Sequence, residues 1–482
     1  YSFFQSSGEN FGMTNYDFVI DGIGAWDIGK GTWLSEGDAA MNSSKNSRER
    51  LLSFFGRANW SWKDRYLLMA SIRHEGSSKF GKNNRWGTFW SLSGGWRISN
   101  EQWMKDISWI NDLKIRVGYG VTGNNNFSSG VTVPTYSSNS YWIYDGEWVV
   151  SYGHSKNVNN DLRWEQKSEF NFGIDYSLLN NRLYGKVDVY RRGISGMLYS
   201  IRVPQPPAIY ETTVMNYGNL ENIGWEVEIG GVPVRKNDFQ WTTTLRMSHS
   251  DSRITSLWGS NTYSDRVEFP SPGNPGYGGR MEEGTQIGQF YIWKYAGVTE
   301  EGKWLIYDKN DNIILADNRK YEDKRYIGNA IPAVIASWNH SFRYKSLSLD
   351  INLRSWIDFD VFNTINMYYG LATDTGINVL RSAYIENRHI KQEKVLCDYW
   401  LEDGTFLKID AISLGYTLDM KKWQKIIDNI HFFFTARDVA CFSMYSGLNP
   451  EVNINGLDAG YEWFSSIYPR TARFTLGGKI TF

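Results

Sequence analysis

The residue types that most often carry catalysis are present, but their spacing forms no catalytic motif. The six histidines are scattered along the 482 residues without HExxH or any other metal-ligand spacing. The sequence also contains no GxSxG motif and no P-loop. Asp358 and Asp360 are a conceivable glycosidase pair. They stand two residues apart after an expected strand, however, which favours solvated carboxylates at the root of a loop. We therefore expect no catalytic residue and no enzyme activity.

Aromatic residues are the most unusual part of the composition. The chain holds 22 Trp, 30 Tyr and 25 Phe, or 16% of all residues. Such a content fits either girdles at a membrane–water interface or stacking platforms for sugars. Aromatic residues in long loops could line a glycan path, or could pack the loops against each other or against a partner protein. These residues are Trp142, Tyr144, Trp148, Tyr152, Trp258, Tyr263, Tyr277, Tyr368 and Tyr369.

Bulk properties exclude one class and leave another open. The net charge is −1, so no basic field indicates nucleic acid as a partner. No apolar run approaches the ~18 residues of a membrane helix. The mean hydropathy of −0.46 is typical of a soluble protein, but a transmembrane barrel also averages low because polar and apolar residues alternate. Cys397 and Cys441 allow one disulfide or two free thiols, and their spacing does not decide between them.

Alternation with a period of two residues predicts the elements that position these side chains. Between Glu165 and Arg192, two alternating runs flank the turn Leu179–Arg182, which predicts an antiparallel hairpin. Similar runs recur along the chain and give about 13 main strands. The phase of the apolar residues slips near Ala411, which indicates a β-bulge.

Short turns and long connections alternate strictly, as in outer-membrane barrels. The fold class predicted is therefore all-β, a transmembrane antiparallel β-barrel that this chain does not complete. We expect residues 1–48 to be a long extracellular loop and 49–482 the C-terminal portion of the barrel. Within it, 252–332 is expected to be an elaborated extracellular loop. An odd number of strands cannot close an even-stranded barrel, and open edges are not viable in lipid. We therefore expect the first strands of the barrel to precede Tyr1, on another chain or in an omitted segment.

The two faces of such a wall have different neighbours. Phe170, Phe172, Ile174 and Val187 are predicted to contact outer-membrane lipid. Five strand tryptophans are predicted to anchor at the membrane interface: Trp60, Trp90, Trp96, Trp225 and Trp241. Charged residues on the opposite face are predicted to line the lumen: Arg57, Lys114, Arg116, Glu226, Glu228, Asp350, Arg354, Arg473 and Lys479.

Several stretches resemble the SusC/RagA family of TonB-dependent outer-membrane transporters of Bacteroidetes. They include LKIRVGYGVTGN (113–124), YGNLENIGWEVEIG (217–230), EDGTFLKIDAISLGYTL (402–418) and the terminal YPRTARFTLGGKITF (468–482). These matches, which include 51–99, 159–183 and 284–298, run in family order over most of the chain. The closing Phe482 resembles the terminal aromatic residue of outer-membrane proteins.

The resemblance implies a plugged barrel of about 22 strands in the bacterial outer membrane. It also implies energised import of oligosaccharides with a SusD-like surface lipoprotein, or of oligopeptides in the RagA branch. The plug and the contact with TonB–ExbB–ExbD would belong to a companion N-terminal segment. One stretch departs from the calcium-loop-like pattern of the family. Asp308, Asn310 and Asn312 keep oxygen ligands, but Ile313 replaces the turn glycine. A polar turn without a cofactor is preferred over a Ca²⁺ site.

Two alternatives remain open from the sequence. The first is a passive porin-like barrel, which the absence of a plug would permit. The second is a soluble all-β protein that binds or hydrolyses glycans. That second alternative requires the apolar rows to face a common core, so an outward apolar belt would exclude it.

Overall fold

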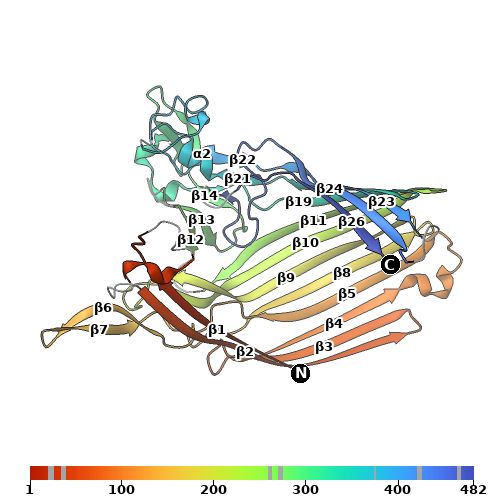
Figure 1. The fold of residues 1–482 in the computed structure, drawn as a ribbon, viewed down its shortest axis with the longest axis horizontal. Helices are drawn as coiled ribbons and strands as arrows, with labels where there is room; N and C mark the ends of the chain where they lie inside the picture. Colours follow the sequence, from red (N-terminus) through yellow and green to blue (C-terminus); the bar gives the residue numbers. More distant parts are fainter. Residues whose placement is uncertain are drawn as a thin grey trace.

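The largest element of the structure is one antiparallel sheet of 14 strands, here called the wall (Figure 1). The computed structural model describes residues 1–19, 26–33, 40–258, 263–269, 275–373, 376–420, 426–463 and 468–482. The wall strands, in their order across the sheet, are β1 (Ser2–Thr14), β2 (Ala40–Trp62), β3 (Tyr66–Ser77), β4 (Trp86–Arg97), β5 (Ile110–Asn124), β8 (Glu165–Leu178), β9 (Leu183–Arg202), β10 (Thr212–Lys236), β11 (Phe239–Leu257), β19 (Val334–Tyr344), β20 (Leu347–Ile357), β23 (Phe406–Asp419), β24 (Asn429–Ser443) and β26 (Arg473–Thr481).

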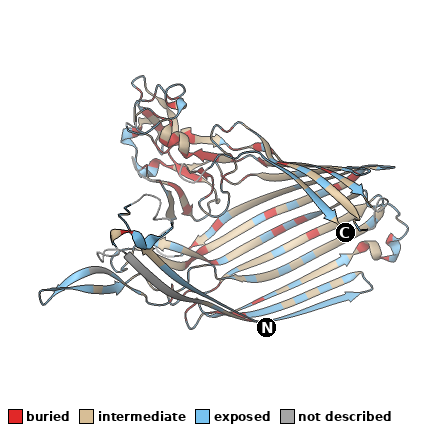
Figure 2. Cartoon of the chain, in the orientation of Figure 1, coloured by how far each residue is buried: buried red, intermediate tan, exposed pale blue. Residues whose placement is uncertain are grey.

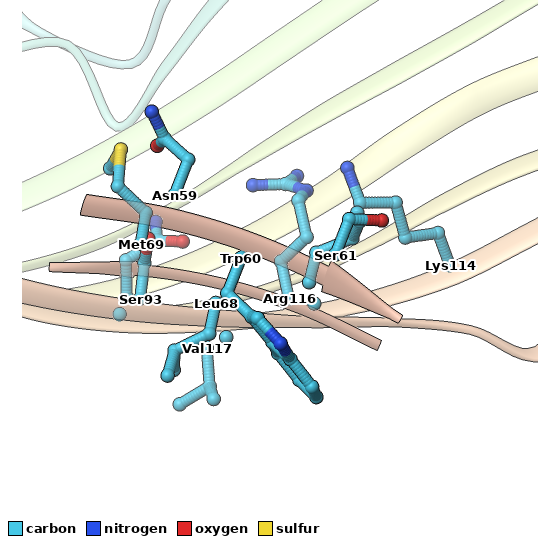
Figure 3. Close-up of a pocket in the computed structure, with 14 residues that line it drawn as sticks. Asn59, Trp60, Ser61, Leu68, Met69, Ser93, Lys114, Arg116 and Val117 are labelled. Atoms are coloured by element: carbon cyan, nitrogen blue, oxygen red, sulfur yellow. The ribbon is translucent and has the colours of Figure 1, made fainter. Parts of the chain in front are cut away.

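The register of the ladders gives the wall one apolar and one polar face. Ile115, Ile174, Val187 and Val227 are paired in turn across β5, β8, β9 and β10. The residues next to these in each strand form a second row, which lies on the other face of the sheet. This row consists of Lys114, Asp175, Lys186 and Glu228. Figure 3 shows this alternation in β2–β5, where Trp60 and Val117 lie on one side of the sheet and Asn59 and Arg116 on the other.

Large apolar side chains on the first face are exposed and contact no core. Trp60 is 55% exposed, Phe170 48%, Leu414 49% and Phe434 43%. Figure 2 shows exposed positions recurring along the wall strands, while buried ones gather where the loops fold together. An exposed apolar belt is what a lipid-facing surface requires. This belt contradicts the soluble all-β alternative.

One end of the wall carries short turns and the other long connections. In three of the short turns, residues other than glycine adopt positive φ angles, as tight hairpin turns require. They are Lys63 and Asp64, Leu179 to Asn181, and Asn237. The other end carries the long connections. The bulge expected near Ala411 is confirmed, because both ladders of β23 shift their register at Asp410.

The strand count and the N-terminal segment differ from the sequence prediction. The prediction of a loop over 1–48 is wrong for Ser2–Thr14, which forms β1, and for residues from Ala40 onward, which belong to β2. Residues 20–25 and 34–39 of that expected loop lie outside the described residues. The wall thus has 14 strands and not an odd number. The side chains of β1 are nearly all exposed and do not alternate, so only its backbone ladder to β2 defines the strand.

The wall is open. β1 and β26 are its two edge strands, and no described residue of one pairs with the other. Among the described residues, no helix is long and apolar enough to cross a membrane.

The described parts of three long connections fold together into one compact body, here called the loop domain: residues 258, 263–269, 275–333, 358–373, 376–405 and 444–463 (Figure 1). The region predicted as an elaborated loop, 252–332, supplies its largest part, but the prediction is wrong for residues 252–257, which belong to β11. Its elements are β12 (Tyr263–Glu268), β13 (Tyr277–Glu282), β14 (Phe290–Ile292), β15 (Lys294–Val298), β16 (Trp304–Tyr307), β17 (Ile313–Leu315), β18 (Arg325–Ile327), β21 (Asp360–Asn363), α2 (Thr364–Tyr369), β22 (Leu401–Asp403) and β25 (Tyr461–Glu462).

The core of the loop domain is aromatic. Trp304, Phe362 and Trp400 are completely buried there, and the side chains of Trp304 and Trp400 meet edge to face with ring centroids 5.7 Å apart. β6 (Tyr136–Tyr144) and β7 (Glu147–His154) form a separate hairpin that projects from the wall (Figure 1). The short 3₁₀ helices are Ile28–Lys30, Ile98–Asn100, Gln102–Met104, Ala316–Asn318, Tyr321–Asp323, Arg381–Ala383 and Asp398–Trp400.

Candidate functional site

The charged residues that the sequence assigned to the lumen share the polar face of the wall. Arg116 donates two hydrogen bonds of 2.8 Å to Asp175 and one of 3.0 Å to Asp188. Glu228 accepts a 2.7 Å hydrogen bond from Arg246, the residue opposite it on β11. The register brings Arg57 and Glu226 to the same face. The polar face is thus lined by paired charges of both signs.

Three further charged positions of this group are also paired. Asp350 accepts a 3.1 Å hydrogen bond from Arg343, and Arg473 donates one of 3.1 Å to Asp438. Arg354 donates a 2.8 Å hydrogen bond to Asp410 and also contacts Glu451. A polar cavity of about 440 Å³ lies on this face, lined by Arg116, Asn171, Asp175, Lys186, Asp188, Tyr190, Arg192 and Glu226.

A second cavity, with a volume of about 610 Å³, lies between the polar face and the loop domain. Its floor is the loop-side end of β8 to β11 and β19, and its cover comes from residues 287, 331 and 454–458. Because β9, β10 and β11 have 20, 25 and 19 residues, they extend well beyond the ~11 residues that a membrane crossing needs. This cavity is built on those extensions. We call it the junction cavity.

Aliphatic side chains dominate the lining of the junction cavity. Ile194 and Leu220 come from the wall, whereas Ile287, Ile331 and Leu457 come from the connections. Tyr199 is its one aromatic lining residue, and its buried hydroxyl has no hydrogen-bond partner. The sequence analysis missed this site. The signal available was a few isolated aliphatic residues in otherwise polar loops.

Two lining residues of the junction cavity form an ion pair. Arg266 of β12 donates hydrogen bonds of 2.9 and 2.6 Å to the two carboxylate oxygens of Asp458, a residue 192 positions away. The guanidinium also lies 4.5 Å from the ring centroid of Tyr199. Two of the connections are thereby joined to each other and to β9 beside the cavity.

A cluster of charges fastens the third connection to the wall. Lys408, whose side chain is 6% exposed, lies 2.8 Å from Asp438 and 3.3 Å from Glu451. Glu451 belongs to the connection between β24 and β26, and it also contacts Arg354 and Arg470. Glu451 therefore joins its connection to two cations of the wall, Arg354 and Lys408, and to Arg470 of the same connection.

The loop aromatics predicted as ligand or partner contacts do not gather in one place. Trp142, Tyr144 and Trp148 are 63%, 69% and 69% exposed on the β6–β7 hairpin, as is Tyr152 at 74%. Tyr368 is 4% exposed inside the loop domain.

The remaining loop aromatics have neighbours at the loop-side end. Tyr369 packs against the aromatic core. Arg163 lies over the ring of Trp258, and Arg280 lies 3.8 Å from the ring centroid of Tyr263. Tyr277 lies beneath Arg202 at 5.1 Å.

Beside Tyr263, the loop domain buries two cations among tyrosines. Arg280 forms a 2.8 Å ion pair with Asp265, which raises the pKa of the guanidinium against the effect of burial. Lys324 is 5% exposed and donates a 2.6 Å hydrogen bond to the carbonyl of Tyr277. Its ammonium lies 4.4 Å from the ring centroid of Trp293. Burial lowers the pKa of Lys324 to about 7.

The expected polar turn uses its oxygen ligands internally. Asp308 accepts hydrogen bonds of 2.8 Å from the backbone N–H groups of Asn310 and Asn312. The amide of Asn312 adds a third hydrogen bond, which lowers the pKa of Asp308. Within the described part of the chain, no group of three or more His, Cys, Asp or Glu side chains is placed to hold a metal ion.

Two smaller sequence questions have structural answers. Asp358 and Asp360 follow β20, and Asp360 accepts a 2.8 Å hydrogen bond from the backbone N–H of Asn329. Burial raises the pKa of Asp360. Cys397, buried in the loop domain, and Cys441, exposed on β24, are both free thiols.

Comparison with known proteins gives consistent matches. The family model described as "TonB dependent receptor-like, beta-barrel" matches residues 2–356. The TonB-dependent receptor SusC of Bacteroides thetaiotaomicron is 30% identical over 449 residues, which cover 90% of this chain and 44% of that protein. The TonB-dependent receptor P39 of Formosa agariphila is 26% identical over 496 residues, which cover 90% of this chain and 46% of that protein.

The fold also matches a solved structure, that of the RagAB peptide transporter, with a TM-score of 0.79 at 23% identity. The match covers 92% of this chain and 48% of the other. The chain spans about half the length of the relatives it matches.

Proposed function

Because this chain belongs to the family of TonB-dependent receptor-like β-barrels of the bacterial outer membrane, we propose that it forms part of the wall of an energised importer. The observation that carries the proposal is the two-faced wall. An exposed apolar belt on one face suits lipid, and paired charges on the other suit a hydrated or protein-filled interior.

The wall needs further strands to function in a membrane. Its edges β1 and β26 are unpaired with each other, and unpaired backbone groups are costly in hydrocarbon. If the closed barrel has the 22 strands implied by the family resemblance, about eight more must complete it. We propose that an N-terminal segment supplies these strands, the plug and the contact with TonB–ExbB–ExbD.

The cargo belongs to an oligomeric nutrient class. Similarity to SusC supports the oligosaccharides expected first from the sequence, with a SusD-like lipoprotein as partner at the loop side. The likeness to the RagAB peptide transporter supports the fold alone, so oligopeptides remain the second candidate until a site favours them. The loop aromatics are divided between the exposed β6–β7 hairpin, which carries Trp142 and Trp148, and the interior of the loop domain, which holds Tyr368.

Energised import is tested with the full-length protein in its native outer membrane. Uptake of labelled oligosaccharides and oligopeptides is compared in cells with and without TonB. Import predicts that uptake of one class disappears without TonB and that a surface lipoprotein co-purifies with the receptor in detergent. Uptake that persists without TonB, together with ion conductance of the purified protein in planar bilayers, would indicate a passive porin instead.

A further inference from the structure

We infer that the junction cavity binds a short apolar segment of an oligopeptide cargo. The inference rests on the proposed import function and narrows its substrate class. With about 610 Å³, the cavity lies within the size range of ligand sites and exceeds the space for a single side chain. It lies on the polar face of the wall at its loop-side end, where cargo would enter the barrel.

The chemistry of the lining discriminates between the two cargo classes. Ile194, Leu220, Ile287, Ile331 and Leu457 offer aliphatic surface, and Tyr199 is the one aromatic ring. Burying aliphatic groups against such a lining is favourable. A sugar ring carries hydroxyl groups on most of its carbons. The polar lining residues can pair with some of them, but hydroxyl groups that face the aliphatic majority of the lining would be left without partners. An oligopeptide with apolar side chains matches this lining, whereas an oligosaccharide does not.

Polar groups at the same cavity suit a peptide backbone. Ser250, Ser252 and Glu165 add hydroxyl and carboxylate groups to the lining. A peptide backbone presents alternating donors and acceptors between its side chains, so apolar walls with a few polar groups can hold both parts at once.

The Arg266–Asp458 ion pair gives this site its cover. It joins β12 to the connection that carries Leu457, one residue from Asp458. The guanidinium also lies 4.5 Å from the ring centroid of Tyr199, so the same arginine contacts the wall strand β9. Arg266 is therefore a positioning residue for both walls.

The test measures peptide binding to the detergent-purified full-length receptor by calorimetry. The probes are two nonapeptides of alanine and serine that differ only in three central residues, leucine in one and serine in the other. Maltoheptaose represents the oligosaccharides. We expect the leucine peptide to bind at least tenfold more tightly than the serine peptide, as the burial of leucine side chains implies.

Two variants locate the effect. Ile194→Trp fills the cavity from the wall and should bring the affinity ratio of the two peptides close to one. Ile223→Trp, the matched control, adds the same volume on the exposed apolar face of β10 and should leave the ratio unchanged.

The outcomes separate this inference from the proposed function. Equal affinity for both peptides, a ratio that Ile194→Trp leaves unchanged, or maltoheptaose binding that Ile194→Trp abolishes would each overturn the peptide assignment. Selective leucine-peptide binding without TonB-dependent uptake would support the site and refute import.

Discussion

The wall and the loop domain bury their apolar side chains in opposite directions. In the wall, Trp60 and Leu414 point outward and are about half exposed, whereas Arg116 and Asp188 pair on the other face. In the loop domain, Trp304 and Trp400 point inward and are completely buried. The wall is thus built for lipid outside, and the loop domain for water outside. The junction cavity lies where these two arrangements meet.

The loop domain should depend most on its aromatic core. Trp304→Ala removes an indole that packs on Tyr295, Tyr399 and Trp400 and donates a hydrogen bond to the Glu393 carbonyl. We expect a loss of about 3–5 kcal/mol in the free energy of unfolding of the loop domain. Urea unfolding followed by hydrogen exchange of β16 measures it. Trp103→Ala, at a side chain that is 61% exposed, serves as the control and should cost almost nothing.

The wall should respond to the face on which a charge is placed, whatever the local sequence. Phe172→Arg puts a cation on the apolar face and should destabilise the membrane-inserted barrel by about 2–4 kcal/mol. Asn171→Arg places the same cation one residue earlier on the polar face and should be tolerated. The folded fraction, read from heat-modifiable mobility in gels, compares them. Equal effects would contradict the assignment of the two faces.

The connection between the two regions should be weaker than either core. Glu451→Gln leaves Lys408, Arg354 and Arg470 with one carboxylate fewer. We expect a cost of roughly 2 kcal/mol, below the range for fully buried pairs because some partners are partly exposed. Faster proteolysis between β24 and β26 would report it. Glu322→Gln, at an ion pair whose two side chains are each 53% exposed, should leave proteolysis unchanged.

The smallest effect should be a pH dependence confined to the loop domain. Lys324 has a pKa of about 7 in the folded protein, below its usual 10.5, so the unfolded chain binds more protons between these values. Stability should therefore rise with pH above 7, by about 1 kcal/mol between pH 7 and 8. Lys324→Met should remove this slope. Thermal unfolding across pH 6–9 measures it, and an unchanged slope in the variant would refute the role of Lys324.

The sequence predicted the structure of the wall better than that of the loop domain. The hairpin around Leu179–Arg182, the bulge at Asp410 and the common face of Arg116, Glu228 and Arg354 all follow from local alternation, and the structure has them. The sequence did not predict β1, because its exposed side chains do not alternate between polar and apolar. Only its pairing with β2 makes it a strand.

The sequence by itself determined the two faces of the wall, because a strand turns each side chain to the face opposite its neighbour's and needs no distant information. Only the tertiary structure decided the loop domain and the junction cavity. Their defining contacts join residues far apart, such as Arg266 with Asp458 and Tyr461 with the carbonyl of Gly278. Local sequence patterns do not predict such long-range contacts, because the loops around them are polar and aperiodic. The fold of the wall was therefore readable in advance, and the site was not.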